Sequence, residues 1–164
     1  GWDVSVYDPR RSESLGLRFK DAHRILSGDP GKLRHAVDAA NCPMAVVMSH
    51  DFQLDSQLLR ALLPSAAVYV GVLGPRRRTD KLLAELRASG MNLPHELTRR
   101  LYSPVGLAIG AETPEEIALA IVSEAQAALS GERAGFLRER TGPVHVPRPV
   151  DSAVSERLAL EAAE

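Results

Sequence analysis

The sequence predicts an α/β fold of the doubly wound kind, in which helices cover both faces of a mostly parallel sheet. Three observations lead to this prediction. Short apolar segments alternate with longer segments of helical periodicity. Two of these apolar segments, residues 44–48 and 67–73, carry no charged side chain, which is typical of strands buried on both faces. Polar turn residues follow each of the two segments.

Composition limits the number of domains and the classes of function that the chain can have. The chain has 164 residues, with 20 basic and 21 acidic side chains, so its formal net charge is −1. That length predicts one domain, or one domain plus a tail. The near-zero charge argues against a nucleic-acid binder, since such affinity comes largely from neutralised phosphates. The single cysteine, Cys42, allows no intrachain disulfide or Cys-rich zinc site and suits a reducing, cytoplasmic compartment. No apolar run approaches the roughly 20 residues that cross a membrane.

The first third of the chain predicts two strands, a helix and a third strand. Residues 2–7 favour a strand through Trp, Val and Tyr, and Pro9 prevents further ladder pairing. We expect a second short strand near residues 23–26. After a turn cluster, residues 30–40 predict a helix, and residues 44–48 follow as a buried strand.

The middle of the chain continues the alternation. Residues 54–63 place five leucines on one stripe of a helix. Residues 67–73 form the next buried strand. The helix expected over residues 75–89 stops at Gly90, and a short helix is expected after Pro94.

The last part of the chain predicts one strand, one long helix and a tail. Residues 105–109 are interpreted as the final strand. Thr113, Pro114 and Glu116 have the spacing of a helix start with a capping box, and that helix is expected to run to residue 129. We expect a domain over residues 1–146 and a C-terminal tail over residues 147–164.

One expected part of such a fold is missing. A doubly wound dinucleotide fold begins with a strand, a glycine-rich turn and a helix, but this chain has no G-x-G-x-x-G. It begins with what looks like the second strand, and in the usual order the absent first strand is central. Without it, two half-sheets have unpaired inner edges. We therefore predict that the functional protein contains a strand, glycine loop and helix before Gly1, or that a partner supplies that strand.

Candidate site residues follow the predicted strands. Because the carboxyl ends of parallel strands meet at one edge of the sheet, where ligands of open α/β folds bind, we expect these residues to lie along one rim. The candidates are Asp8, Arg10, His50, Asp51, Gly74, Arg76, Arg77 and Glu112.

The stretch from Gly74 to Arg78 is the most informative of these. Its three arginines fall in the first turn of a predicted helix, where cations oppose the helix dipole. Free backbone N–H groups at a helix start attract anions, and arginine matches phosphate with two-pronged geometry. The arrangement favours a phosphate site. The alternative is a solvated basic face balanced partly by Asp80.

Other candidates have two interpretations. Asp8 occupies the place of a ribose-binding carboxylate, or simply forms a turn before Pro9. His50 suits proton transfer or ligand contact, while Asp51 either orients it or caps the next helix. Cys42 is interpreted as a small buried side chain rather than a sulfur carrier, because it precedes a strand and no cation flanks it.

Together these motifs have a recognisable order. They are Gly1-Trp2, Asp8-Pro9-Arg10, Arg18-Phe19, Val47-Met48-Ser49-His50-Asp51, Gly71-Val72-Leu73-Gly74-Pro75-Arg76-Arg77-Arg78, Pro104-Val105-Gly106-Leu107, Gly110-Ala111-Glu112-Thr113-Pro114-Glu115-Glu116 and Gly142-Pro143-Val144-His145. The set resembles the C-terminal Rossmann-like domain of the XdhC/CoxI family and covers nearly all of residues 1–146. Two departures are visible. The family usually has Ser where this chain has Pro75, and the family's N-terminal domain and Rossmann glycine loop have no counterpart here.

The resemblance implies a function. Family members are accessory proteins of molybdenum hydroxylases such as xanthine dehydrogenase. The implied activity is binding of the molybdenum–pterin cofactor (molybdopterin), support of its sulfuration and delivery to the apo-hydroxylase. A sulfur donor is an implied second partner, and the chain would act as a cofactor-binding chaperone more than as a catalyst. The alternatives are an NAD(P)-dependent oxidoreductase and a nucleotide-binding regulatory module that use the same crevice. The sequence leaves the oligomeric state open.

Overall fold

The computed structural model describes residues 2–10 and 14–143. The chain divides into two compact units, Gly1–Ala134 and Gly135–Glu164. In the second unit the described part holds the short helix η2 (Leu137–Glu139), where the Arg138 guanidinium lies over the Phe136 ring. The expected boundary between residues 146 and 147, the tail, and Val144 and His145 of the last motif lie outside the described residues. All candidate site residues belong to the first unit.

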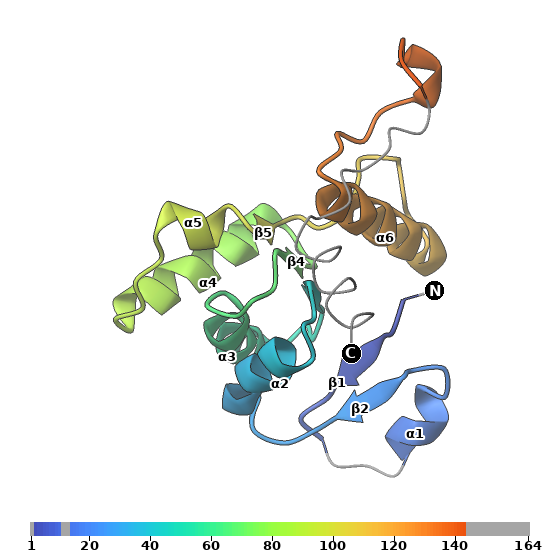
Figure 1. The fold of residues 1–164 in the computed structure, drawn as a ribbon. Coiled ribbons are helices and arrows are strands. Elements are labelled where there is room, and N and C mark those ends of the chain that lie inside the picture. Colours follow the sequence, from blue (N-terminus) through green and yellow to red (C-terminus); the bar gives the residue numbers. More distant parts are fainter. Residues whose placement is uncertain (1, 11–13, 144–164) are drawn as a thin grey trace, which may run out of the picture. The chain divides into compact units, whose positions relative to one another are not determined.

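The first unit contains two parallel sheets. In one, β1 (Ser5–Tyr7) pairs with β2 (Arg24–Leu26), and Figure 1 shows the two strands side by side. In the other, β4 (Tyr69–Val72) lies between β3 (Met44–Val47) and β5 (Leu101–Tyr102). Parallel strands alternating with helices confirm the predicted fold class. The described strands thus form two separate sheets. That a further strand, from before Gly1 or from a partner, completes them stays a prediction.

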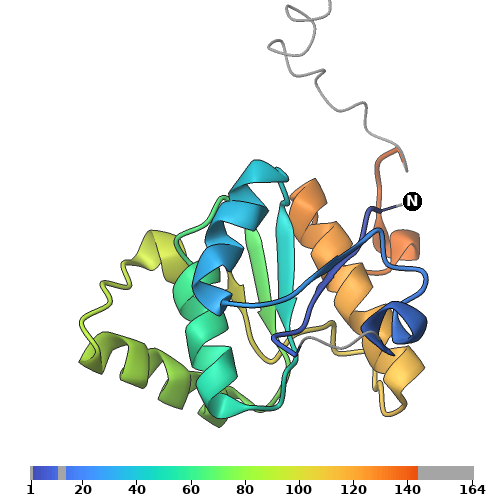
Figure 2. The ribbon, with the colours of Figure 1, turned by 90° about the horizontal axis from the view of Figure 1, so that it is seen from below.

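Helices connect and cover these strands. Along the chain they are α1 (Ser14–Arg18), η1 (Pro30–Lys32), α2 (Leu33–Ala39), α3 (Phe52–Leu62), α4 (Arg76–Ala88), α5 (His95–Thr98) and α6 (Pro114–Ser130). Figure 2 shows α3 on one face of the β3–β4–β5 sheet and α6 on the other, as doubly wound folds require. None of the helices in the described ranges is long and apolar enough to span a membrane.

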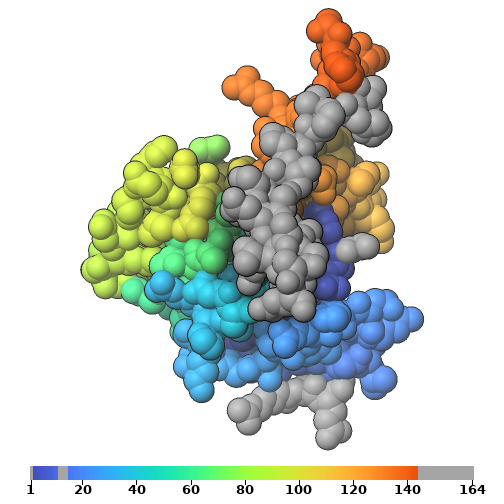
Figure 3. Space-filling view, in the orientation of Figure 1, coloured from blue at the N-terminus to red at the C-terminus, as the bar shows by residue number. Residues whose placement is uncertain are grey.

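The core lies mainly between the sheet and the pair α3 and α4. Val70 and Val72 of β4 point into it and are fully buried beside Leu59, Leu82 and Leu86. The space-filling view shows the atoms of α2, α3 and α4 adjoining one another on this face of the first unit (Figure 3). Alternation along β4 sends Tyr69 and Gly71 to the opposite face, which α6 covers.

Two details of the predicted element order were wrong. The segment over residues 105–109 is a loop, and the last strand is the two-residue β5 just before it. At its first residue the segment still bonds to the sheet, since the Val105 N–H donates to the Val72 carbonyl oxygen of β4. It then turns to α6, where the N–H of Leu107 donates to the carbonyl oxygen of Ala120. Helix α1, which the sequence did not indicate, forms between β1 and β2.

Candidate functional site

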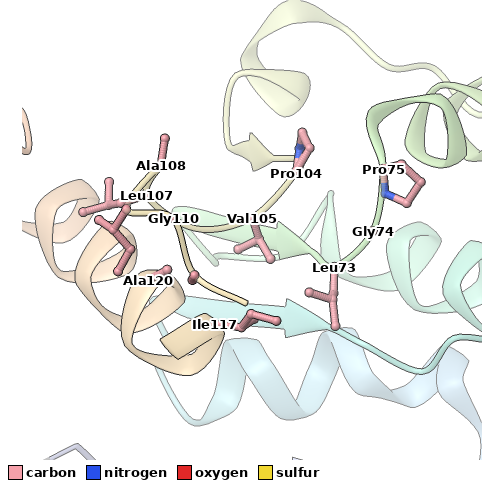
Figure 4. A pocket seen from close by; sticks show the side chains of 12 residues that line it. Leu73, Gly74, Pro75, Pro104, Val105, Leu107, Ala108, Gly110, Ile117 and Ala120 are labelled. Atoms are coloured by element: carbon pink, nitrogen blue, oxygen red, sulfur yellow. The ribbon is translucent and has the colours of Figure 1, made fainter. Parts of the chain in front are cut away.

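The candidate site lies at the carboxyl ends of β3, β4 and β5, an edge that we call the rim. Because the three strands are parallel and adjacent, the turns that follow them gather there. A cleft of about 460 Å³ opens at the ends of β4 and β5 and is called the rim cleft. It is lined by Leu73, Gly74, Pro75, Pro104, Val105, Leu107, Ala108, Ile109, Gly110, Ala111, Ile117 and Ala120. Figure 4 shows these side chains on three chain segments, which are the turn after β4, the loop after β5 and the start of α6.

Buried hydrogen bonds fix the two walls of the rim cleft. The Thr79 and Ser103 hydroxyls lie 2.5 Å apart and tie α4 to the beginning of the loop after β5. On the other face, Glu124 Oε2 accepts hydrogen bonds from the Tyr69 hydroxyl at 2.7 Å and the Gly106 N–H at 3.0 Å. Burial, with the hydrogen bond to Glu124 second, raises the pKa of Tyr69, which therefore stays a donor. The cleft walls are thus held by α4, β4 and α6 together.

The lining is apolar in its side chains, but its backbone carries free donors. Within the described residues, the N–H groups of four lining residues have no acceptor, namely Gly74, Ala108, Gly110 and Ala111. The N–H groups of Arg76 and Arg77, which directly follow the lining residue Pro75, also have no acceptor, although neither arginine lines the cleft. These two belong to the first turn of α4, where the helix dipole also favours negative charge. Apolar walls beside unpaired amides suit a ligand that has both a ring and an anionic group.

Arg76 and Arg77 are exposed beside this helix start. Neither guanidinium makes a hydrogen bond or ion pair to any residue that the structure describes. Both cations are therefore free to meet an anion at the rim. Gly74 lines the cleft with a φ of 126°, a conformation that residues with a Cβ rarely adopt.

Arg78, the third arginine of the cluster, is already paired. Its Nη2 donates to Asp55 Oδ2 at 2.6 Å, and the Asp55 side chain is only 2% exposed. Asp55 lies one turn into α3, where the sequence shows only a polar residue between leucines. Sequence reasoning missed it, because nothing local signals a partner 23 positions further along the chain.

The turn after β3 places the histidine candidate on the surface. His50 has a φ of 61°, in the left-handed region, which costs about 1–2 kcal/mol for a residue with a Cβ. Asp51 caps α3 by accepting a hydrogen bond from the Leu54 N–H at 2.9 Å. Neither residue lines the rim cleft. Their turn is joined to α4 through Asp55.

Asp8 and Arg10, which follow β1, form an ion pair with each other. The Arg10 Nε and Nη2 donate to the two carboxylate oxygens of Asp8 at 2.9 Å and 2.6 Å, and the Arg10 N–H adds a third bond. Neither residue lines the rim cleft. A ribose diol at Asp8 would have to add to this pair or displace it.

We expect Asp8 to titrate unusually low. The Arg10 side chain, and then the Arg10 N–H, lower the pKa of Asp8 to about 2. Because the folded-state pKa is depressed, the stability that this pair contributes is complete above the unfolded value of about 3.9 and is lost as the pH falls through about 2. A carboxyl-carbon NMR titration should show this, and Arg10→Gln should return the Asp8 pKa toward its ordinary value. An unchanged pKa in that variant would contradict the pairing.

The remaining candidates lie apart from the cleft. Glu112 is exposed at the start of α6, and its N–H, with that of Thr113, donates to the Glu116 carboxylate and lowers the pKa of Glu116. The predicted capping box of Thr113 and Glu116 is confirmed. Cys42 is half-buried, and its Sγ donates to the Met44 carbonyl oxygen. Among the described residues, no cluster of three His, Cys, Asp or Glu side chains could hold a metal ion.

Comparisons with known proteins agree with this architecture. Residues 1–125 match the family model described as the XdhC Rossmann domain. The chain is 35% identical over 124 residues to a probable xanthine dehydrogenase subunit from Bacillus subtilis strain 168, a match that covers 76% of this chain and 35% of the relative. It is 27% identical over 144 residues to the uncharacterized protein YqeB of Escherichia coli strain K12, covering 87% of this chain and 26% of that protein.

A solved structure gives the same result. A crystal structure described as that of a xanthine dehydrogenase from Bacillus halodurans superposes with a TM-score of 0.61 at 31% identity, covering 81% of this chain and 37% of that one. The chain thus spans between 26% and 37% of the length of these relatives. Since the family model matches most of its residues, the chain belongs to the XdhC family and contains that family's Rossmann domain.

Proposed function

We propose that this chain is the cofactor-binding part of an accessory protein for a molybdenum hydroxylase of the xanthine dehydrogenase type. In this proposal the rim cleft takes the molybdenum–pterin cofactor as cargo, and the protein supports its sulfuration and its delivery to the apo-hydroxylase in the cytoplasm. A sulfur donor is a second proposed partner. Family membership supports the class of partner, and the chemistry of the cleft supports the class of ligand.

The single observation that carries the proposal is the pairing of apolar walls with unpartnered donors. The walls, formed in part by Leu73, Val105 and Ile117, suit the flat ring system of a pterin. The start of α4, with Arg76 and Arg77 beside it, suits a phosphate or pyrophosphate.

A second candidate ligand is a nucleotide, with Asp8, which does not line the rim cleft, as the residue for its ribose. Asp8 follows the strand β1, the place where a ribose-binding carboxylate stands in dinucleotide folds. The observation favours an NAD(P)-dependent oxidoreductase or a nucleotide-binding regulatory module. Against it, the two Asp8 oxygens already accept hydrogen bonds from Arg10.

The test is a binding measurement on the double variant Arg76→Ala/Arg77→Ala. We expect its affinity for anaerobically released molybdenum–pterin cofactor to fall about thirtyfold, the effect of losing two exposed charged contacts of about 1 kcal/mol each. Binding is measured as molybdenum retained with the protein on ultrafiltration. Unchanged retention would remove the two arginines from the site.

The matched control is Lys81→Ala/Arg87→Ala. It removes the same charge from exposed positions of α4 that lie beyond the first turn, so it should retain the cofactor like the unaltered chain. A parallel titration with NADPH separates the candidates. Tight NADPH binding with hydride transfer, together with no retention of molybdenum, would favour the oxidoreductase.

A further inference from the structure

A buried carboxylate connects two turns of the rim. Asp55 Oδ1 accepts a hydrogen bond from the Ser49 hydroxyl at 2.5 Å, and Asp55 Oδ2 accepts one from Arg78 Nη2 at 2.6 Å. Ser49 follows β3 and Arg78 lies in the first turn of α4, so one side chain holds two separate segments. A carboxylate that is 2% exposed is tolerated because both of its oxygens have strong donors.

On the Ser49 side, the connection reaches His50. The Ser49 hydroxyl oxygen also accepts a hydrogen bond from the Asp51 N–H at 3.2 Å. This bond joins the two residues on either side of His50. His50 has the left-handed φ of 61° that this turn requires. Strained backbone of this kind persists only where the surroundings hold it. Asp55, through Ser49, is the buried group that does so.

On the Arg78 side, the connection reaches the rim cleft. A Cβ placed on Gly74 would lie 3.4 Å from Arg78 Cδ, so the arginine stem packs beside the glycine that lines the cleft. The guanidinium also lies 5.7 Å from the centre of the Phe52 ring. Arg78 is therefore held by Asp55 and the Phe52 ring, and its stem packs beside the turn that begins at Gly74.

We infer that Asp55 is a positioning residue of the anion site. It contacts no ligand, but it fixes the His50 turn and the Gly74 turn relative to each other through Ser49 and Arg78. This inference rests on the proposed function, since it concerns the same site. In this inference Arg78 holds the Gly74 turn in place, and Arg76 and Arg77 bind the anion.

The direction in which one substitution changes the affinity for an anion distinguishes a positioning role of Asp55 from a purely electrostatic one. Asp55→Asn removes a negative charge near an anion site, so a purely electrostatic effect would raise the affinity for an anion. Loss of positioning has the opposite effect, because a misplaced turn no longer directs its donors at the ligand. With inorganic pyrophosphate as the probe, we expect Asp55→Asn to bind about tenfold more weakly. Titration calorimetry measures this on the folded protein.

The matched control is Asp80→Asn. Asp80 is an exposed carboxylate on α4 for which the described part of the chain shows no hydrogen bond or ion pair. Its removal should leave pyrophosphate affinity unchanged or slightly higher. If Asp55→Asn behaves in the same way while folded, the positioning role is wrong.

A second variant tests the inference without relying on the stability of Asp55→Asn. Ser49→Ala breaks the hydroxyl connection to Asp55 and should shift the backbone amide NMR signals of His50 and Gly74, whereas Ser49→Thr should restore them. This readout needs no ligand, so it separates the two proposals. If the unaltered chain does not bind pyrophosphate but these shifts occur, the anion site of the proposed function fails, while the link that Asp55 makes between the His50 turn and the Gly74 turn stands. If the signals do not move in Ser49→Ala, the positioning role is overturned.

Discussion

Replacing Arg100 with Met is expected to destabilise the folded chain by about 3 kcal/mol, the largest effect that we predict for one side chain. The Arg100 guanidinium donates to the carbonyl oxygens of Leu63, Ser65 and Ala67. These carbonyls follow the end of α3, where helical partners are missing, and their residues are at most 4% exposed. Met keeps an apolar stem of similar length but leaves the carbonyl groups buried without a donor. Each hydrogen bond to a charged group contributes about 1.5–3 kcal/mol, so the loss of several exceeds an ordinary surface substitution.

Urea unfolding followed by circular dichroism measures this difference. Arg99→Met is the matched control, because Arg99 is the adjacent residue, is exposed and its side chain makes no hydrogen bond or ion pair to the described residues. That variant should lie within about 0.5 kcal/mol of the unaltered chain. Arg100→Lys should fall between the two, because a lysine ammonium is a cationic donor but lacks the planar fork of nitrogens that reaches the three carbonyl oxygens. Equal stability of the Arg99 and Arg100 variants would show that the carbonyls do not depend on Arg100.

The elements with strong local signals were predictable from sequence. The strands β3 and β4 were expected because an uninterrupted apolar run is typical of a strand buried on both faces. Burial was predicted correctly for β4 only, because β3 is half-buried except at Val47, and Met48, which follows it, is exposed. The start of α6 was expected because a capping box is encoded within four residues. Residues 105–109 misled the prediction because they are also apolar. Their apolar side chains line the cleft and contact α6 instead of filling a strand position. The glycine at 106, which has a φ of 107°, was the sequence signal that the segment bends.

The candidate site was predictable only in outline. That polar turns meet at one rim follows from the parallel sheet, and the rim cleft includes Gly74 and the loop at Gly110. The sequence could not predict which arginine is paired within the fold and which are left for an anion. Arg78 is distinguished from Arg76 only by its partner Asp55, which lies on another helix. The Asp8 and Arg10 pair is the reverse case. Two opposite charges two positions apart at a turn were a local signal that could have predicted their mutual hydrogen bonds.

Gly71→Ala is expected to destabilise the chain by about 2–3 kcal/mol, the usual range for overpacking a closed core. Gly71 is buried in β4, and a Cβ there would lie 2.6 Å from Val105 Cγ2. It would also approach the Tyr69 ring at 3.2 Å. Val105 lines the rim cleft, so its displacement should weaken ligand binding as well as stability. Thermal and urea unfolding measure the first effect, and the pyrophosphate titration measures the second.

The compensating variant makes the Gly71 prediction specific. In Gly71→Ala/Val105→Ala the 2.6 Å contact is gone, while the closer approach to Tyr69 remains, so stability should return in part rather than in full. Gly16→Ala is the matched control, because a Cβ at Gly16 in α1 meets no atom within 4 Å and alanine favours a helix over glycine. That substitution should be neutral or slightly stabilising. If Gly71→Ala were equally mild, Val105 would not lie against β4, and the cleft wall that depends on this contact would have a different shape in solution.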